Sequence, residues 1–303
     1  MPFYFTCPYC HLRTLVDDRF AGSTGPCADC AKTVTIPGRS PEAIDLSPPV
    51  RKLNTRKELI RLAIQITASL AIILAILGVS AAIVIPALEQ ARKGRNRSLC
   101  LNNMRQIVNA LNAYAKEHGT YPPPAVVDSK GKPLYSWRVL ILPQLGFDGL
   151  YGQFILDQPW DSPTNLSLFK DMPDVFASPG SPDAKAVSES NYVLLTGIGS
   201  LFPKTGPMSP KQITDDPAQT ILLAETTNSR MKWTEPGDID ASLGITLGNR
   251  PRIDIGGNHQ DGINVVAADG TPMVLPTDIS SVVVDAMKTP NGGERIDTSS
   301  LKP

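Results

Sequence analysis

An uncharged apolar run, residues 62–88, constrains the fold of this chain more than any other stretch. It contains no Asp, Glu, Lys or Arg. About twenty consecutive apolar residues in a helix cross the ~30 Å hydrocarbon core of a bilayer, so this run is long enough to span it with some tilt. The alternative is a helix buried in a soluble core, but core helices of this length are seldom free of charge. The sequence therefore predicts a transmembrane helix over residues 59–88.

The following residues, 89–119, have the pattern of an amphipathic helix. Apolar residues recur there at intervals of three or four with polar residues between them: Leu101, Met104, Ile107, Val108, Leu111 and Tyr114. Gly119 and the prolines after it predict the helix end, because glycine suits a left-handed cap and proline cannot continue a helix. Since no loop signal separates the two segments, we expect one long helix, half in lipid and half against a globular domain. This arrangement resembles the N-terminal helix of type IV pilins and pseudopilins, with Pro86 and Gly94 as expected bending positions.

Two cysteine pairs dominate residues 1–38, namely Cys7 with Cys10 and Cys27 with Cys30. The spacing C-x2-C, sixteen residues, C-x2-C is that of a four-cysteine zinc site, in which two turns each supply two thiolates to a tetrahedral ion. A segment this short cannot bury a core, so metal binding would supply most of its folding free energy, of order ~10–16 kcal/mol. Two disulfides or a redox C-x2-C are the alternatives. Disulfides need an oxidising compartment, and we expect no cleavable signal peptide before these cysteines. We predict a structural zinc ribbon.

Residues 39–58 are predicted to form a linker, because they combine prolines with mixed charges. Lys and Arg flank the apolar run on both sides, so the positive-inside rule does not orient it. We orient the N-terminus toward the cytoplasm because zinc thiolates persist best in a reducing compartment, and because pilin-like helices run in the same direction.

The remaining residues, 120–303, are predicted to form a globular β-rich domain. Short apolar segments there alternate with Gly, Pro, Asp and Asn, and we predict strands at residues 136–142, 191–195, 220–224, 263–267 and 272–275. Asp269-Gly270 predicts a hairpin turn between the last two strands, and Thr277-Asp278 is expected to cap a helix over residues 279–287. The expected fold class is α+β: a long N-terminal helix packed on an antiparallel sheet and preceded by a zinc ribbon.

Five blocks of sequence resemble, in order, successive blocks of one bacterial family. They are residues 136–145, 150–165, 221–240, 256–271 and 289–294. The chain resembles, over roughly residues 62–297, the pilin-like family catalogued as domain of unknown function 1559, which is abundant in planctomycetes. The resemblance implies a pilin-like protein of the cell envelope, anchored once in the bacterial inner membrane, with its C-terminal domain in the periplasm. No biochemical role is implied.

The chain departs from that family at two places. Members usually have a Gly-Phe processing signal and a glutamate in the apolar run, whereas here Gln65 is the only strongly polar residue in the first turns of the run. We therefore expect neither ordinary leader removal nor ordinary filament assembly. Members often carry a cysteine, in a Cys-Pro-Ser element, that could pair with a cysteine at position 100. In this chain Ser178 stands in place of that partner cysteine. Cys100 is thus expected to be unpaired.

Signals for other sites are weak. Glu235, Asp238 and Asp240 could form an oxygen cage for calcium, with a solvated acidic loop as the alternative. His259 could be combined with Asp261 and Asp269, but no nucleophile motif surrounds them, and we expect His259 to be a turn residue bonded to backbone.

Composition excludes one further class of partner. Lys and Arg together number 29, as do Asp and Glu, and no basic patch with interleaved aromatic residues occurs, so we expect no nucleic-acid partner.

Three functions fit these features. The first is a non-enzymatic, membrane-anchored pilin-like protein that interacts with like subunits and whose ribbon binds a cytoplasmic protein. The second is a transmembrane sensor that couples an external ligand to the ribbon. The third, a membrane-anchored hydrolase, is disfavoured because the nucleophile motif is missing. The expected partners are the lipid bilayer, further copies of the chain and a cytoplasmic protein.

Overall fold

The computed structural model describes residues 1–38, 55–257, 259 and 262–296, in two compact units divided within the long helix at Ile76 and Leu77. Most of the predicted linker, residues 39–54, lies outside the described residues.

The N-terminal segment consists of two small hairpins. Strand β1 (Phe3–Thr6) pairs antiparallel with β2 (Arg13–Val16), and β3 (Thr24–Pro26) pairs antiparallel with β4 (Thr33–Thr35). A 3-10 turn, η1 (Asp18–Phe20), lies between them. Among residues 1–38 the buried apolar side chains are those of Cys7 and Val34. A core of this size cannot offset the conformational entropy lost on folding.

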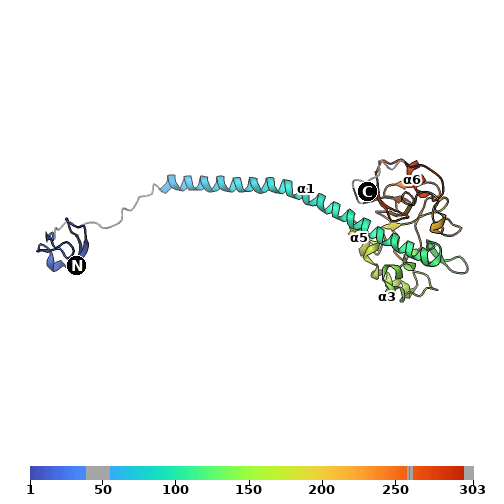
Figure 1. Cartoon of the computed structure of the whole chain (residues 1–303), viewed down its shortest axis with the longest axis horizontal. Helices are drawn as coiled ribbons and strands as arrows, with labels where there is room; N and C mark the ends of the chain where they lie inside the picture. Colours follow the sequence, from blue (N-terminus) through green and yellow to red (C-terminus); the bar gives the residue numbers. More distant parts are fainter. Residues whose placement is uncertain (39–54, 258, 260–261, 297–303) are drawn as a thin grey trace. The chain divides into compact units, whose positions relative to one another are not determined.

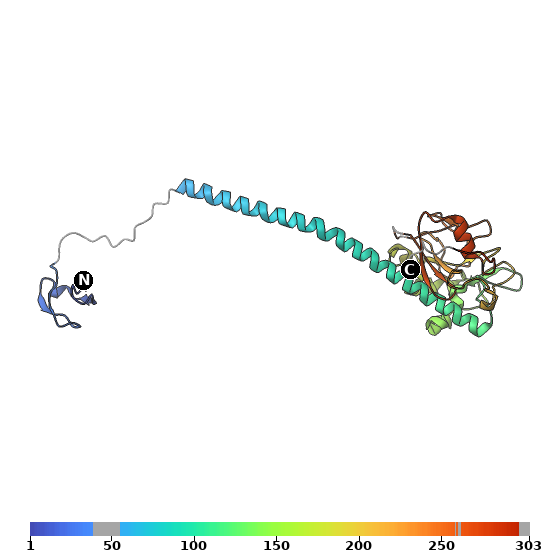
Figure 2. The same ribbon diagram turned by 45° about the horizontal axis from the view of Figure 1, so that its top comes forward.

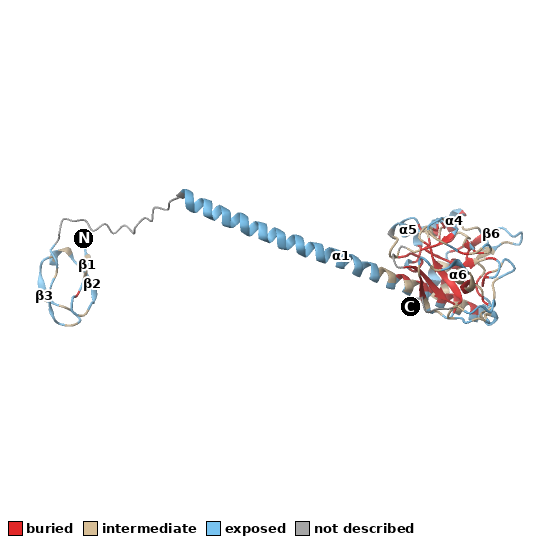
Figure 3. Ribbon diagram, turned by 90° about the horizontal axis from the view of Figure 1, so that it is seen from above, coloured by how far each residue is buried: buried red, intermediate tan, exposed pale blue. Residues whose placement is uncertain are grey.

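Helix α1 (Thr55–His118) is continuous over 64 residues, as the sequence predicted (Figure 1). Pro86 lies inside it. The helix ends at Gly119, whose φ of +88° and amide bond to the carbonyl of Ala115 form the predicted left-handed cap. Among the described residues this helix alone is long and apolar enough to cross a membrane, and none of its most apolar window is buried. Figure 3 shows this part of α1 exposed along its length.

The second unit is built on a four-stranded antiparallel sheet in the order β14-β13-β9-β7. Its strands are β7 (Tyr192–Val193), β9 (Ile221–Glu225), β13 (Ile263–Ala267) and β14 (Pro272–Leu275). The predicted hairpin is confirmed: Asn264 pairs with Val274 across β13 and β14. The Asp269-Gly270 turn places Gly270 at φ +94°, a conformation that glycine adopts without strain.

Helix α1 covers one face of this sheet, and α6 (Ser281–Lys288) covers the other (Figure 2). The buried stripe of α1 recurs at three- and four-residue intervals and consists of Cys100, Met104, Ile107, Val108, Ala110, Leu111 and Ala115. It packs in one core with Tyr192, Leu222 and Val266. Burial of each large aliphatic side chain contributes roughly 1.5–3 kcal/mol, so this stripe holds the C-terminal part of α1 on the sheet.

One predicted element was wrong, and the start of another was misplaced. Residues 136–142 are not a strand: β6 (Pro133–Ser136), which pairs with β5 (Ala125–Val127), ends at Ser136. The Ser136 side chain accepts a hydrogen bond from the amide of Arg138 and caps α2 (Trp137–Leu140). Helix α6 likewise begins later than predicted, because Ser280 caps it in place of Thr277-Asp278.

The remaining elements are short. They are η2 (Pro143–Leu145), α3 (Asp148–Tyr151), α4 (Pro163–Ser167), η3 (Leu168–Asp171), η4 (Asp174–Phe176), α5 (Pro182–Ala186), β8 (Leu195–Thr196), η5 (Pro210–Gln212), β10 (Ile239–Asp240), β11 (Thr246–Leu247) and β12 (Asp254–Ile255). The pairs β8–β10 and β11–β12 are parallel, so not every pairing is antiparallel as expected. The fold is mixed helix and sheet, as predicted.

Candidate metal centre and buried polar clusters

The four N-terminal cysteines lie on two turns of the same design, residues 7–12 and residues 27–32. In each turn the amide of the first residue donates to the carbonyl of the last, at 3.0 and 2.9 Å. The residue after the second cysteine, His11 or Ala31, has a positive φ of 60° or 56°. This left-handed residue turns the chain back into the next strand, so both thiols of each turn point to the same side. The two turns have the geometry of zinc knuckles, and they bring together the four cysteines that the spacing predicted as a metal site.

The sulfur atoms have the separations that a tetrahedral zinc ion requires. Zn–S bonds of about 2.3 Å place neighbouring sulfurs about 3.8 Å apart. Cys7 Sγ lies 3.8 Å from Cys30 Sγ, and Cys10 Sγ lies 3.7 Å from Cys27 Sγ. All four lie within 4.8 Å of one another, and none forms a disulfide. The site therefore fits zinc, and these four cysteines would hold it.

The electrostatics of the four thiols also favour a bound cation. A hydrogen bond from the amide of Cys10 lowers the pKa of Cys7 to about 6. The amide of Leu12 lowers the pKa of Cys10, but burial and the neighbouring sulfurs of Cys30, Cys7 and Cys27 outweigh it and raise that pKa to about 12. Four thiolates this close repel one another unless a metal ion lies between them.

The three acidic residues predicted as a calcium cage do not converge. Glu235 pairs with Arg252 at 2.7 Å, and Asp240 accepts from the hydroxyl of Ser242 at 2.5 Å. The Asp238 carboxylate is fully buried elsewhere. Each carboxylate already has its own donor, and the described residues form no calcium site from these three.

Asp238 belongs to a buried ion pair that the sequence did not reveal. Its Oδ1 lies 3.1 Å from Nη2 of Arg138, and both side chains are completely buried. Asp238 also accepts from Trp137 Nε1 at 3.0 Å and from the amide of Leu194 at 2.8 Å. Burial raises the pKa of Asp238 to about 6, while the charge of Arg138 opposes this. The guanidinium and the two further donors stabilise the ionised form of the carboxylate.

A second buried cluster joins Cys100, Glu225 and His259. Their possible metal-ligand atoms all lie within 4.8 Å of one another. His259 was predicted to be a turn residue bonded to backbone. The carbonyl of His259 accepts a hydrogen bond from the amide of Gly262 at 3.4 Å, in agreement with that prediction. Its side chain, however, is 5 % exposed, and its Nε2 lies 3.7 Å from Oε1 of Glu225. Ser178, which stands where the family resemblance implied a cysteine, donates to Glu225 at 3.0 Å and so lies in the same cluster.

Another carboxylate, Asp254, orders the loop between β11 and β12. Arg250 donates to it through Nη2 at 2.8 Å and Nε at 3.1 Å, and the hydroxyl of Thr246 donates at 2.5 Å. The Asp254 side chain is 4 % exposed. The Arg250 side chain is the main cause that lowers the pKa of Asp254 to about 2.

Because the pKa of Asp254 is lower in the folded chain than in the unfolded one, its stabilisation is present above about pH 4 and lost as the pH falls toward about 2. We expect Asp254→Asn to cost on the order of 2 kcal/mol at pH 7, and the difference from the parent chain to narrow at pH 3. Urea unfolding of the variant and the parent chain at pH 7 and pH 3 measures this difference in stability. Asp148→Asn, which changes an exposed carboxylate on α3, should shift stability by less than about 0.5 kcal/mol. A cost for Asp254→Asn that stays constant with pH would contradict this account.

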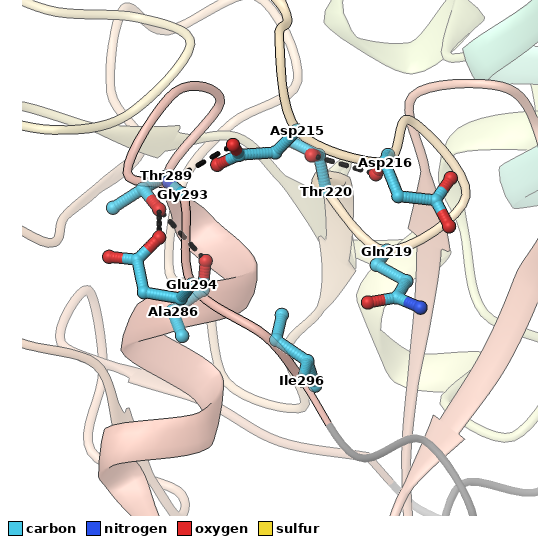
Figure 4. A pocket seen from close by; sticks show the side chains of 9 residues that line it. All are labelled: Asp215, Asp216, Gln219, Thr220, Ala286, Thr289, Gly293, Glu294 and Ile296. Carbon is cyan, nitrogen blue, oxygen red and sulfur yellow. Dashed lines mark hydrogen bonds between the residues drawn. The ribbon is translucent and has the colours of Figure 1, made fainter.

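The described surface also has a small acidic pocket of about 140 Å³. Figure 4 shows Asp215, Asp216 and Glu294 around it. Asp215 accepts from the amides of Gly292 and Gly293, and Thr289 donates to Glu294 at 2.8 Å. Asp215 and Glu294 thus hold the segment after α6 in place, and we assign no ligand to this pocket.

Comparison with protein families gives the class of the chain. The family model described as "Protein of unknown function (DUF1559)" matches residues 89–247, from the amphipathic part of α1 to the end of β11. The chain belongs to this family, as the resemblance of its sequence blocks predicted. The two cysteine turns and the whole apolar run of residues 62–88 precede the matched residues. Neither the comparison with curated proteins nor that with solved structures finds a match.

Proposed function

We propose that this chain is a non-enzymatic, pilin-like protein anchored by one transmembrane helix, with a cytoplasmic zinc ribbon and a periplasmic C-terminal domain. The observation that carries the proposal is the contrast within α1. No described residue buries its apolar part around Leu74, which is 60 % exposed. In contrast, Met104, Ile107 and Leu111 are buried against the sheet. An exposed apolar helix of this length matches a lipid environment.

The environment of the polar groups supports a structural role for the C-terminal domain. Burial raises the pKa of the Cys100 thiol above its ordinary value, which disfavours the reactive thiolate. Asp269 accepts hydrogen bonds from the amide and hydroxyl of Thr271 within the hairpin turn. His259 packs beside Glu225 in the interior. These groups are engaged in holding the fold.

The ribbon is the part proposed to bind a cytoplasmic protein. It exposes large aromatic side chains at Tyr4, Tyr9 and Phe20. Arg13 lies 4.6 Å from the ring centre of Tyr4, and Lys32 lies 5.0 Å from that of Tyr9. Aromatic side chains bordered by cations are typical of protein interfaces. The C-terminal domain is proposed to contact further copies of the chain.

A charge in the proposed membrane span tests the proposal. Placing Arg at the centre of a transmembrane helix costs roughly 2.5–3.5 kcal/mol on insertion scales. We expect Leu74→Arg to reduce strongly the fraction of protein that resists carbonate extraction. In spheroplasts of the parent strain, external protease should remove the C-terminal domain and leave an N-terminal tag intact.

Ile198→Arg is the matched control, because Ile198 is 75 % exposed in the C-terminal domain and lies outside the proposed span. This variant should resist carbonate extraction as the parent chain does, and its N-terminal tag should stay protected from external protease. Carbonate extraction of the parent chain would refute the membrane anchor, and digestion of the tag with protection of the C-terminal domain would reverse the proposed orientation.

A further inference from the structure

Three different metal-ligand side chains meet at one buried point of the second unit. Cys100 comes from α1, Glu225 from the end of β9, and His259 from the segment between β12 and β13. The residues Cys100 and Glu225 are 0 % and 1 % exposed, and the side chain of His259 is 5 % exposed. We propose that these three residues form a second metal site, distinct from the ribbon, for a divalent ion of the zinc class.

The distances suit such an ion. Bonds of about 2.0–2.3 Å in a tetrahedral zinc site place neighbouring ligand atoms roughly 3.3–3.7 Å apart. The nitrogen of His259 and the oxygen of Glu225 already lie 3.7 Å apart. All the ligand atoms lie within 4.8 Å of one another. Side-chain rotations that move these atoms by about 1 Å would therefore give tetrahedral zinc distances. A thiolate, a carboxylate and an imidazole are all ligands that zinc accepts.

Neighbouring donors orient two of the ligands. Asn264 donates to Glu225 Oε2 at 2.7 Å and approaches the Cys100 sulfur at 3.4 Å. The hydroxyl of Tyr192 donates to the same sulfur at 3.3 Å, and Ser178 donates to Glu225 Oε1. Donors around a sulfur and a carboxylate favour their ionised, metal-binding forms and fix their directions.

The charges around the cluster set the expected strength of binding. Burial raises the pKa of Glu225 to about 7, and it raises the pKa of Cys100 as well. The charge of Arg97 partly opposes the shift of Glu225, and Arg97 Nη2 donates to the carbonyl of Gly262 at 3.3 Å. A metal ion must therefore displace protons and tolerate a nearby guanidinium. We expect weaker binding than at the four thiolates of the ribbon.

The Glu225 carboxylate of the cluster lies close to a surface cleft. Gly257 lies so close to Glu225 that a Cβ there would be 3.1 Å from Oε2. The same glycine lines a surface cleft of about 200 Å³, together with Asn249 and Thr277. The carboxylate thus lies directly behind the wall of an open cleft. An ion bound there would connect α1 to the sheet through Cys100.

The test uses the full-length chain in detergent with all four ribbon cysteines replaced by serine, so that the ribbon cannot bind metal. Metal-free protein is titrated with Co²⁺, which gives a charge-transfer absorption band when a thiolate binds it, and then with competing Zn²⁺. We expect a near-stoichiometric band that Zn²⁺ removes. Cys100→Ser should abolish the band, and Glu225→Gln or His259→Gln should weaken Co²⁺ binding at least tenfold.

His118→Gln is the control, because it changes an exposed histidine at the end of α1 and should leave binding unchanged. Near-UV circular dichroism identifies variants that remain folded, and added Zn²⁺ should raise the thermal midpoint of the ribbon-free chain. No band and no thermal shift in the folded ribbon-free chain would overturn the proposal. A band that persists in Cys100→Ser, or that is unaffected by both Glu225→Gln and His259→Gln, would overturn it as well.

Discussion

Removal of zinc is expected to unfold the ribbon completely. The apolar side chains buried within residues 1–38 are those of Cys7 and Val34, so packing contributes little to its stability. Structural zinc in comparable peptides supplies about 10–16 kcal/mol of apparent binding free energy at neutral pH. A purified fragment of residues 1–45 should contain near-stoichiometric zinc, and a chelator should abolish its β-sheet circular dichroism.

Cys27→Ser should lose both zinc and structure, because it removes one of the four ligands. His11→Ala is the matched control: His11 immediately follows Cys10, but four thiolates complete the coordination without it. Its zinc content should equal that of the parent fragment. A fragment that keeps its circular dichroism in chelator would show that the knuckles fold without metal, and the assignment would then be wrong.

The second large effect is expected at the buried ion pair of Arg138 and Asp238. Removing one partner of such a pair leaves an uncompensated charge and typically costs about 3–5 kcal/mol. We therefore expect Asp238→Asn to destabilise the C-terminal domain by that amount, since the guanidinium of Arg138 would lose its paired charge and retain neutral acceptors such as Ser136 Oγ and the carbonyl of Tyr192. Urea unfolding followed by the fluorescence of the buried Trp137 and Trp233 measures the loss.

Two further variants distinguish an effect of charge burial from a general effect of substitution. Asp240→Asn changes an exposed carboxylate two residues from Asp238, in β10, and should cost less than about 1 kcal/mol. The double variant Arg138→Met with Asp238→Leu removes both charges and should recover much of the stability, because apolar pairs of similar volume often replace buried ion pairs at little cost. Equal losses in the double variant and in Asp238→Asn would contradict the explanation.

Local signals in the sequence were sufficient for the elements that depend on local physics. The long helix, with its end at His118, followed from an apolar period of 3.6 and a glycine cap. The hairpin of β13 and β14 followed from alternation around Asp269-Gly270. The region 136–142 shows the limit of such signals, because a run of apolar residues fits both a strand and a buried helix. The side chain of Ser136 decides in favour of the helix, because it caps the helical turn that follows.

The sequence by itself determined which four cysteines meet in the ribbon, because two C-x2-C turns place their thiols independently of the rest of the chain. Only the tertiary structure decided the two buried polar clusters. Arg138 and Asp238 are 100 residues apart, and Cys100 and Asn264 are 164 apart. Their meeting depends on which face of the sheet each strand presents to α1 and to α2. A shift of one residue in strand register would reverse those faces, and no local pattern around Asp238 or His259 specifies that register.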